Sequence, residues 1–67
     1  MNEIKKITSA EFTDIILSEK NGKYEPLGLF YLKEKDSNVY VGVDNSSGYA
    51  WTEDFKSLSA CKHWLKN

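Results

Sequence analysis

Three strand-like runs joined by very short turn segments lie between residues 27 and 55, and they constrain the fold more than any other feature. The runs are Leu27 to Lys33, Val39 to Val43 and Tyr49 to Phe55, each rich in β-branched or aromatic side chains. The segments EKDSN and DNSSG between them consist of turn-forming residues. Because such short loops join neighbouring antiparallel strands, the sequence predicts a three-stranded antiparallel meander.

A helix is predicted before the meander. Thr8 followed three positions later by Glu11 fits a capping box, and Ile7 and Phe12 stand at the positions of a hydrophobic staple. Apolar residues then recur at helical spacing as far as the stop signal Asn21-Gly22.

A second helix is predicted after the meander. Ser57 can cap it, and its apolar stripe contains Leu58, Cys61 and Leu65, with Trp64 beside the stripe. The first six residues, MNEIKK, are expected to form a frayed end or a short edge strand. At 67 residues the chain has room for one small α+β domain, spanning 1–67, with the order helix, three-stranded antiparallel meander, helix.

The alternation of side chains along a strand sorts the meander into two faces, if both turns are four-residue loops. One face then carries Phe30, Leu32, Val39, Val41, Val43, Ala50 and Thr52. The other carries Leu29, Tyr31, Tyr40, Gly42, Tyr49, Trp51 and Glu53. Because two short helices offer enough apolar side chains for one face only, we expect both helices on the same face and the aromatic face uncovered.

The aromatic face is therefore the predicted partner-binding surface, since tyrosine and tryptophan bury much area at little side-chain entropy. Its predicted binding residues are Leu29, Tyr31, Tyr40, Tyr49, Trp51 and Glu53. A structural alternative stays open, in which Trp51 lies over Gly42 and completes the core. A three-residue second loop would also move Trp51 to the valine face.

Catalytic and metal-binding patterns are not evident, so the sequence predicts neither an enzyme nor a cofactor. Cys61 and His63 are two apart on a helix and point in different directions, and one cysteine with one histidine cannot supply the four ligands of structural zinc. We expect Cys61 to be a small core residue. DNSSG departs from the spacing of a calcium loop, and Glu53 and Asp54 point to opposite faces of a strand.

The charge balance and the lone cysteine bear on partners and compartment. Formal net charge is -1, and all nine basic residues are lysines, which lack the guanidinium fork suited to phosphate and guanine. One cysteine forms no internal disulfide, and no long apolar run indicates a signal peptide or membrane span, so a cytoplasmic location without membrane contact is expected. Because glycosylation acceptor sites matter only in secreted chains, we interpret the sequon Asn45-Ser46-Ser47 as a coincidence of the turn's composition.

Three segments carry a resemblance to a protein group: GLFY at Gly28 to Tyr31, VGVDNSSGYAWTEDF at Val41 to Phe55, and CKHWL at Cys61 to Leu65. With them the chain resembles a group of short, uncharacterised proteins encoded in phages and prophages of Gram-positive bacteria, over its C-terminal two thirds. The group offers no fold or activity to carry over. The resemblance implies that this chain is encoded among phage genes. Small phage proteins of this kind often bind and block a host protein, such as a defence nuclease or a replication or transcription factor.

Two functions follow as hypotheses. The first is a non-enzymatic module that binds a host or phage protein, or a second copy of itself, through the aromatic face or the adjacent edge strand. The alternative is a nucleic-acid-binding module in which the aromatics stack on bases while Lys33, Lys35 and Lys56 track the backbone. The predicted element order is also that of double-stranded RNA-binding domains, but the last helix lacks a dense basic start and the net charge is negative. The charge balance favours the protein-binding class.

Overall fold

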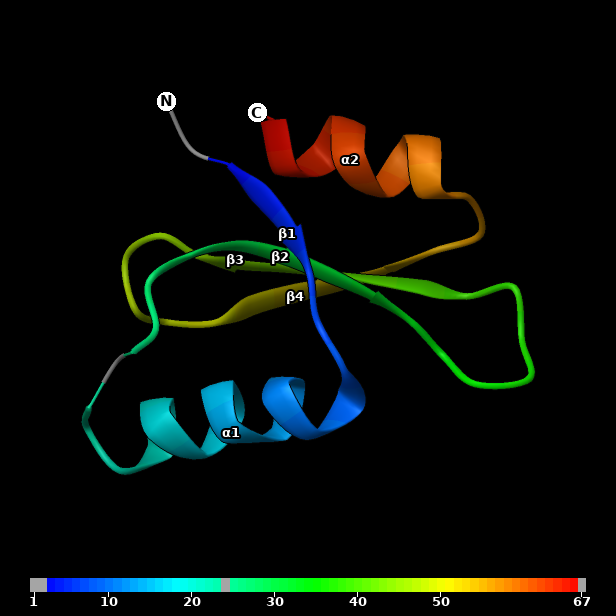
Figure 1. Cartoon of the computed structure of the whole chain (residues 1–67). Helices are drawn as coiled ribbons and strands as arrows, with labels where there is room; N and C mark the ends of the chain where they lie inside the picture. The colour runs from blue at the N-terminus through cyan, green and yellow to red at the C-terminus, as the bar shows by residue number, and fades with distance from the viewer. Residues whose placement is uncertain (1–2, 24, 67) are drawn as a thin grey trace.

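The computed structural model describes residues 3–23 and 25–66 and shows an α+β arrangement. Two helices and four strands follow one another in the order β1 (Ile4–Lys6), α1 (Ser9–Lys20), β2 (Gly28–Lys33), β3 (Tyr40–Asn45), β4 (Trp51–Phe55) and α2 (Leu58–Lys66). Figure 1 shows the strands as one sheet between two helices. The predicted α+β class is therefore confirmed, and three details of the prediction need correction or extension.

The first correction concerns the sheet, which has four strands in the order β1-β2-β3-β4 rather than three. Strands β2, β3 and β4 form the predicted antiparallel meander, and β1 adds to it in parallel with β2. A parallel neighbour requires a crossover connection, which α1 provides. Of the two expectations for MNEIKK, the short edge strand holds from Ile4 to Lys6, and residues 1–2 lie outside the described part.

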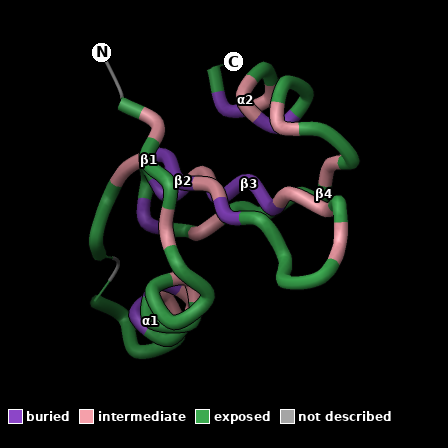
Figure 2. Tube along the Cα trace, turned by 45° about the vertical axis from the view of Figure 1, so that its right-hand side comes forward, coloured by how far each residue is buried: buried purple, intermediate pink, exposed green. Residues whose placement is uncertain are grey.

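The second correction concerns the helices, which lie on opposite faces of the sheet and not on one (Figure 1). The α1 face is filled mainly by strand side chains, with Ile15 and Phe12 of α1 packed on Phe30, Leu32, Val41 and Val43. The α2 face joins Cys61, Trp64 and Leu65 of the helix to Leu29, Tyr31, Tyr40 and Phe55 of the strands. Figure 2 shows buried positions running along the middle of the sheet, between the two helices. Each helix thus covers one face with two or three apolar side chains.

The third point concerns where α2 packs, and Gly42 decides it. A Cβ on Gly42 would lie 3.0 Å from a ring carbon of Trp64 and 3.1 Å from the Cys61 sulfur. Such distances are shorter than ordinary van der Waals contact, so only glycine admits α2 this closely. The residue over Gly42 is therefore Trp64, and the alternative that placed Trp51 there is wrong.

Local signals at the helix ends behave as predicted. The Thr8 side chain accepts from the backbone N–H of Glu11, and the Glu11 side chain accepts from the N–H of Thr8, which confirms the capping box. Helix α1 ends at the cap Asn21. Ser57 accepts from the backbone N–H of Ala60 at 3.1 Å, as expected of a cap for α2.

Candidate protein-binding surface

The six predicted binding residues fall into two groups. Leu29 is buried, and Tyr31 and Tyr40 are half-buried in the cluster beneath α2. Tyr49 and Trp51 are 62% and 65% exposed, and Glu53 is also exposed. The expectation of an uncovered aromatic face is therefore wrong for the part of the face that α2 occupies. The other part of the face, at the end of the sheet where β3 turns into β4, is uncovered as expected.

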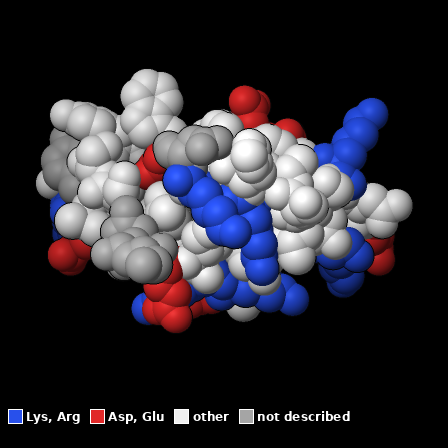
Figure 3. All heavy atoms as spheres, turned by 90° about the horizontal axis from the view of Figure 1, so that it is seen from above, with Lys and Arg blue, Asp and Glu red and all other residues white. Residues whose placement is uncertain are grey.

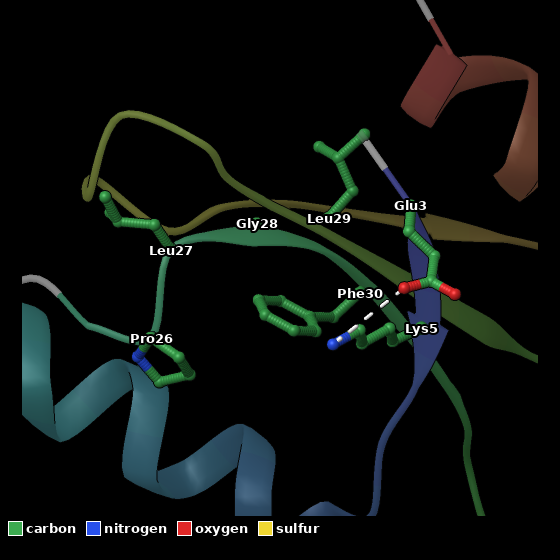
Figure 4. A pocket seen from close by; sticks show the side chains of 7 residues that line it. All are labelled: Glu3, Lys5, Pro26, Leu27, Gly28, Leu29 and Phe30. Carbon is green, nitrogen blue, oxygen red and sulfur yellow. Dashed lines mark ion pairs between the residues drawn. The ribbon is translucent and has the colours of Figure 1, made fainter. Parts of the chain in front are cut away.

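Leu27 belongs with the exposed aromatics, although it was not among the predicted binding residues. Its side chain is 60% exposed and lines, together with Tyr49, a hollow of about 460 Å³. Figure 4 shows Leu27 and Phe30 on opposite sides of β2, with Phe30 directed towards α1 and Leu27 away from it. We call the three exposed residues Leu27, Tyr49 and Trp51 the Trp51 surface.

Alternation along the strand could have found Leu27. Leu27, Leu29 and Tyr31 are two apart, so a continuous strand places all three on the aromatic face. The strand begins one residue later, at Gly28, and its φ of 142° is one that glycine adopts readily. A Cβ there would also lie 3.2 Å from the Phe30 ring, which rests against this glycine.

Asn45 holds the two chain segments of the Trp51 surface together. This residue is 1% exposed, and its Nδ2 donates to the Pro26 carbonyl at 2.6 Å while its Oδ1 accepts from the Ala50 N–H at 2.9 Å. One buried amide thus ties the connector before Leu27 to the turn before Trp51. The same burial removes the sequon's amide nitrogen from the surface of the folded chain.

The β3–β4 turn is fixed by two further features. Asp44 Oδ1 accepts from the backbone N–H of Ser46 at 3.1 Å and from its hydroxyl at 2.6 Å, an aspartate-centred turn. Gly48 has a φ of 91°, as its position in the turn predicted, and Ala50 has a φ of 51°. A positive φ is uncommon and costly for alanine, so local strain lies directly before Trp51. The hydrogen bond that the Ala50 N–H donates to Asn45 Oδ1 stabilises Ala50 in this conformation.

Two acidic residues neighbour Trp51 on its face of the sheet. In the register of β3 and β4, Asp44 lies directly opposite Trp51 and shares its face, and Glu53 is the next residue on that face. In Figure 3, which looks down on the α2 side, most lysine atoms lie over the middle and right-hand half of the molecule. Of the lysines proposed to contact a nucleic acid, Lys33 pairs with Tyr40, which lies opposite Phe55, so Lys33 is at the far end of the strands, about 13 Å along the strand direction from Trp51. Lys35 and Lys56 follow the ends of β2 and β4 in the sequence.

Cys61 behaves as the predicted core residue. It is fully buried, and desolvation raises the pKa of its thiol, while the positive charge of Lys62 lowers the pKa by a smaller amount. Within residues 3–23 and 25–66, no three or more His, Cys, Asp or Glu side chains are grouped so that they could hold a metal ion. None of the helices in that part of the chain combines the length and apolar character needed to cross a membrane.

Comparisons with family models, with curated proteins and with solved structures found no match to this chain.

Proposed function

We propose that this chain is a small, non-enzymatic protein-binding module and that the Trp51 surface is its binding site. The observation that carries the proposal is the exposure of Leu27, Tyr49 and Trp51 at one end of a sheet whose remaining apolar residues are covered. Clustered, exposed apolar side chains with a polar surround mark interaction sites in soluble proteins. Tryptophan and tyrosine are also the residues that most often dominate binding energy.

The resemblance to short phage proteins supports a host protein as the partner, with inhibition or modulation of a defence, replication or transcription factor as the result. Three exposed side chains supply only part of the roughly 800 Å² that each partner contributes to a standard interface. A few anchors must then carry the affinity, and Trp51 is the largest of them.

The nucleic-acid alternative gains less support. Its stacking residues Tyr31 and Tyr40 are half-buried beneath α2, and its three lysines lie at the end of the strands opposite Trp51. A base stacked on Trp51 would meet Asp44 and Glu53, whose carboxylates repel phosphate.

The test is a pull-down from the lysate of a Gram-positive host, with immobilised wild type beside Trp51→Ala and Leu17→Ala. Leu17 is the matched control, because it is 49% exposed on α1, and α1 lies on the face of the sheet opposite to the one that carries Trp51 (Figure 1). We expect a specific protein that wild type and Leu17→Ala retain and Trp51→Ala loses, with affinity for the purified protein lower by about tenfold or more. Equal loss in both variants would contradict the proposal. Recovery of nucleic acid that falls off steeply from 50 to 200 mM salt would favour the alternative.

A further inference from the structure

The outer edge of β4 presents unpaired backbone groups beside Trp51. The Glu34 N–H donates to the Val39 carbonyl at 2.9 Å, so these residues form a hydrogen-bonded pair, and such pairs alternate along an antiparallel ladder. In the register of β2 and β3, this alternation turns the backbone groups of Tyr40, Gly42 and Asp44 towards β4. Their partners on β4 are Phe55, Glu53 and Trp51, whose backbone groups therefore point towards β3. The N–H and C=O groups of Thr52 and Asp54 therefore point out of the sheet, where no fifth strand follows among the described residues.

The charge beside this edge is negative. Glu53 lies on the Trp51 side of the strand and Asp54 on the other, and neither has an ion-pair partner among the described residues. The aromatic cluster under α2 supplies its own cation, since Lys62 Nζ lies 5.5 Å from the centre of the Tyr31 ring. Within residues 3–23 and 25–66, no lysine lies over Trp51 in the same way. An exposed indole between carboxylates suits an arginine or lysine from another chain.

A second copy of this chain fits the edge poorly. Symmetric antiparallel pairing centred on Glu53 places Glu53 opposite Glu53, and pairing centred on Asp54 places Asp54 opposite Asp54. Like charges directly opposite each other destabilise a strand pair. The register centred on Thr52 pairs strand residues 51–53 only, because Ala50 has left the strand.

We propose that the module binds its partner by strand addition, in which an extended segment carrying lysine or arginine pairs with the free edge of β4. The segment's backbone bonds to Thr52 and Asp54, one basic side chain lies against Trp51 and Asp44, and another faces Glu53. This inference rests on the proposed function and specifies the backbone geometry and charge of the partner.

The test begins with a random dodecapeptide library displayed on phage and selected on the wild-type protein, with counter-selection on Trp51→Ala. We expect enrichment of sequences with basic residues at alternate positions and without proline. Amide hydrogen exchange, followed by nuclear magnetic resonance with a selected synthetic peptide, should slow about tenfold or more at Thr52 and Asp54.

Thr52→Pro and Thr52→Val form a matched pair. Proline removes the outward N–H of Thr52 and spares the bonds between β3 and β4, because an edge strand tolerates proline where its N–H faces solvent. Valine keeps the N–H in a side chain of similar shape. We expect Thr52→Pro to weaken peptide binding about tenfold or more and Thr52→Val to leave it unchanged. Glu53→Lys is the second variant, which leaves the backbone intact and should weaken the basic peptides even if Thr52→Pro fails to fold.

Several results would overturn the inference. Peptides that depend on Trp51 yet bind Thr52→Pro normally, and do not slow exchange at Thr52, would exclude strand addition and leave the protein-binding proposal in place. Enrichment of acidic or proline-rich sequences would also overturn the inference. So would a selection that yields no peptide whose binding depends on Trp51. The proposed function is tested separately by the pull-down, and it is contradicted if no lysate protein requires Trp51 for its binding.

Discussion

The two tryptophans mark two regions on the same side of one sheet, and the regions differ in what covers them. Trp64 comes from α2, lies over Gly42 and packs with Phe55 at a ring-centre distance of 5.6 Å. Trp51 comes from β4 at the other end of the strands and is 65% exposed. The same residue type is packed against the core in the first region and lies largely in solvent in the second. The placement of α2 therefore divides the aromatic residues of this face into a buried set and an exposed set.

Removing Trp64 should have the largest effect on stability. Trp64→Ala removes the ring that covers Gly42 and leaves a cavity between α2 and the sheet, so we expect the free energy of unfolding to fall by about 3 kcal/mol. Urea unfolding followed by circular dichroism measures it. Trp64→Phe, which keeps an aromatic contact with Phe55, should lose roughly half as much. A change below about 0.5 kcal/mol for Trp64→Ala would mean that α2 is held by other contacts.

Adding a methyl group at Gly42 should have the next largest effect. Gly42→Ala places a Cβ at 3.0 to 3.1 Å from Trp64 and Cys61, and overpacking of this kind costs about 1–3 kcal/mol. The same unfolding experiment measures this loss.

The double variant Gly42→Ala with Cys61→Ala is the control, because it removes the sulfur that the new Cβ would meet. Its loss should be smaller than the sum of the two single losses, by about 0.5 kcal/mol or more. Strictly additive losses would show that α2 does not pack on Gly42 as described.

Asn45→Ala should weaken the Trp51 surface as well as the fold. The change leaves the Pro26 carbonyl and the Ala50 N–H without their buried partner, which costs about 1–3 kcal/mol. Nuclear magnetic resonance should show the largest shift changes in residues 25–29 and 46–51, with affinity for the partner lowered although Asn45 is not exposed. Changes spread evenly over the sheet would contradict the role of Asn45 in positioning this surface.

The sequence predicts those parts of the fold that depend on local or nearest-strand patterns. The capping box of Thr8 and Glu11, the Ser57 cap and the parity of the meander follow from spacing over a few residues. Strand β1 is harder, because Ile4 is its one apolar residue and its pairing with Leu29 spans a whole helix. The face on which α2 packs depends on the space above Gly42, which Trp64 and Cys61 occupy. These residues are far from Gly42 in the sequence, so their contact with it is seen only in the folded chain.

The candidate site divides in the same way. Alternation assigns Tyr31, Tyr40 and Trp51 to one face, and the register agrees. The length and direction of α2 decide which of these residues it covers. The sequence alone therefore predicts one aromatic surface, whereas in the structure Tyr31 and Tyr40 lie beneath α2 and Trp51 is exposed. The clamp at Asn45 also escapes prediction, since in the sequence Asn45 looks like an ordinary turn residue.

The most direct test of the account is the free energy of unfolding of Trp51→Ala, measured beside Trp64→Ala under identical conditions. Because Trp51 is largely exposed and lies outside both core clusters, we expect a loss below about 0.5 kcal/mol, together with the loss of partner binding. If Trp51→Ala instead destabilises the protein as much as Trp64→Ala, then Trp51 belongs to the core and the binding surface proposed around it is contradicted.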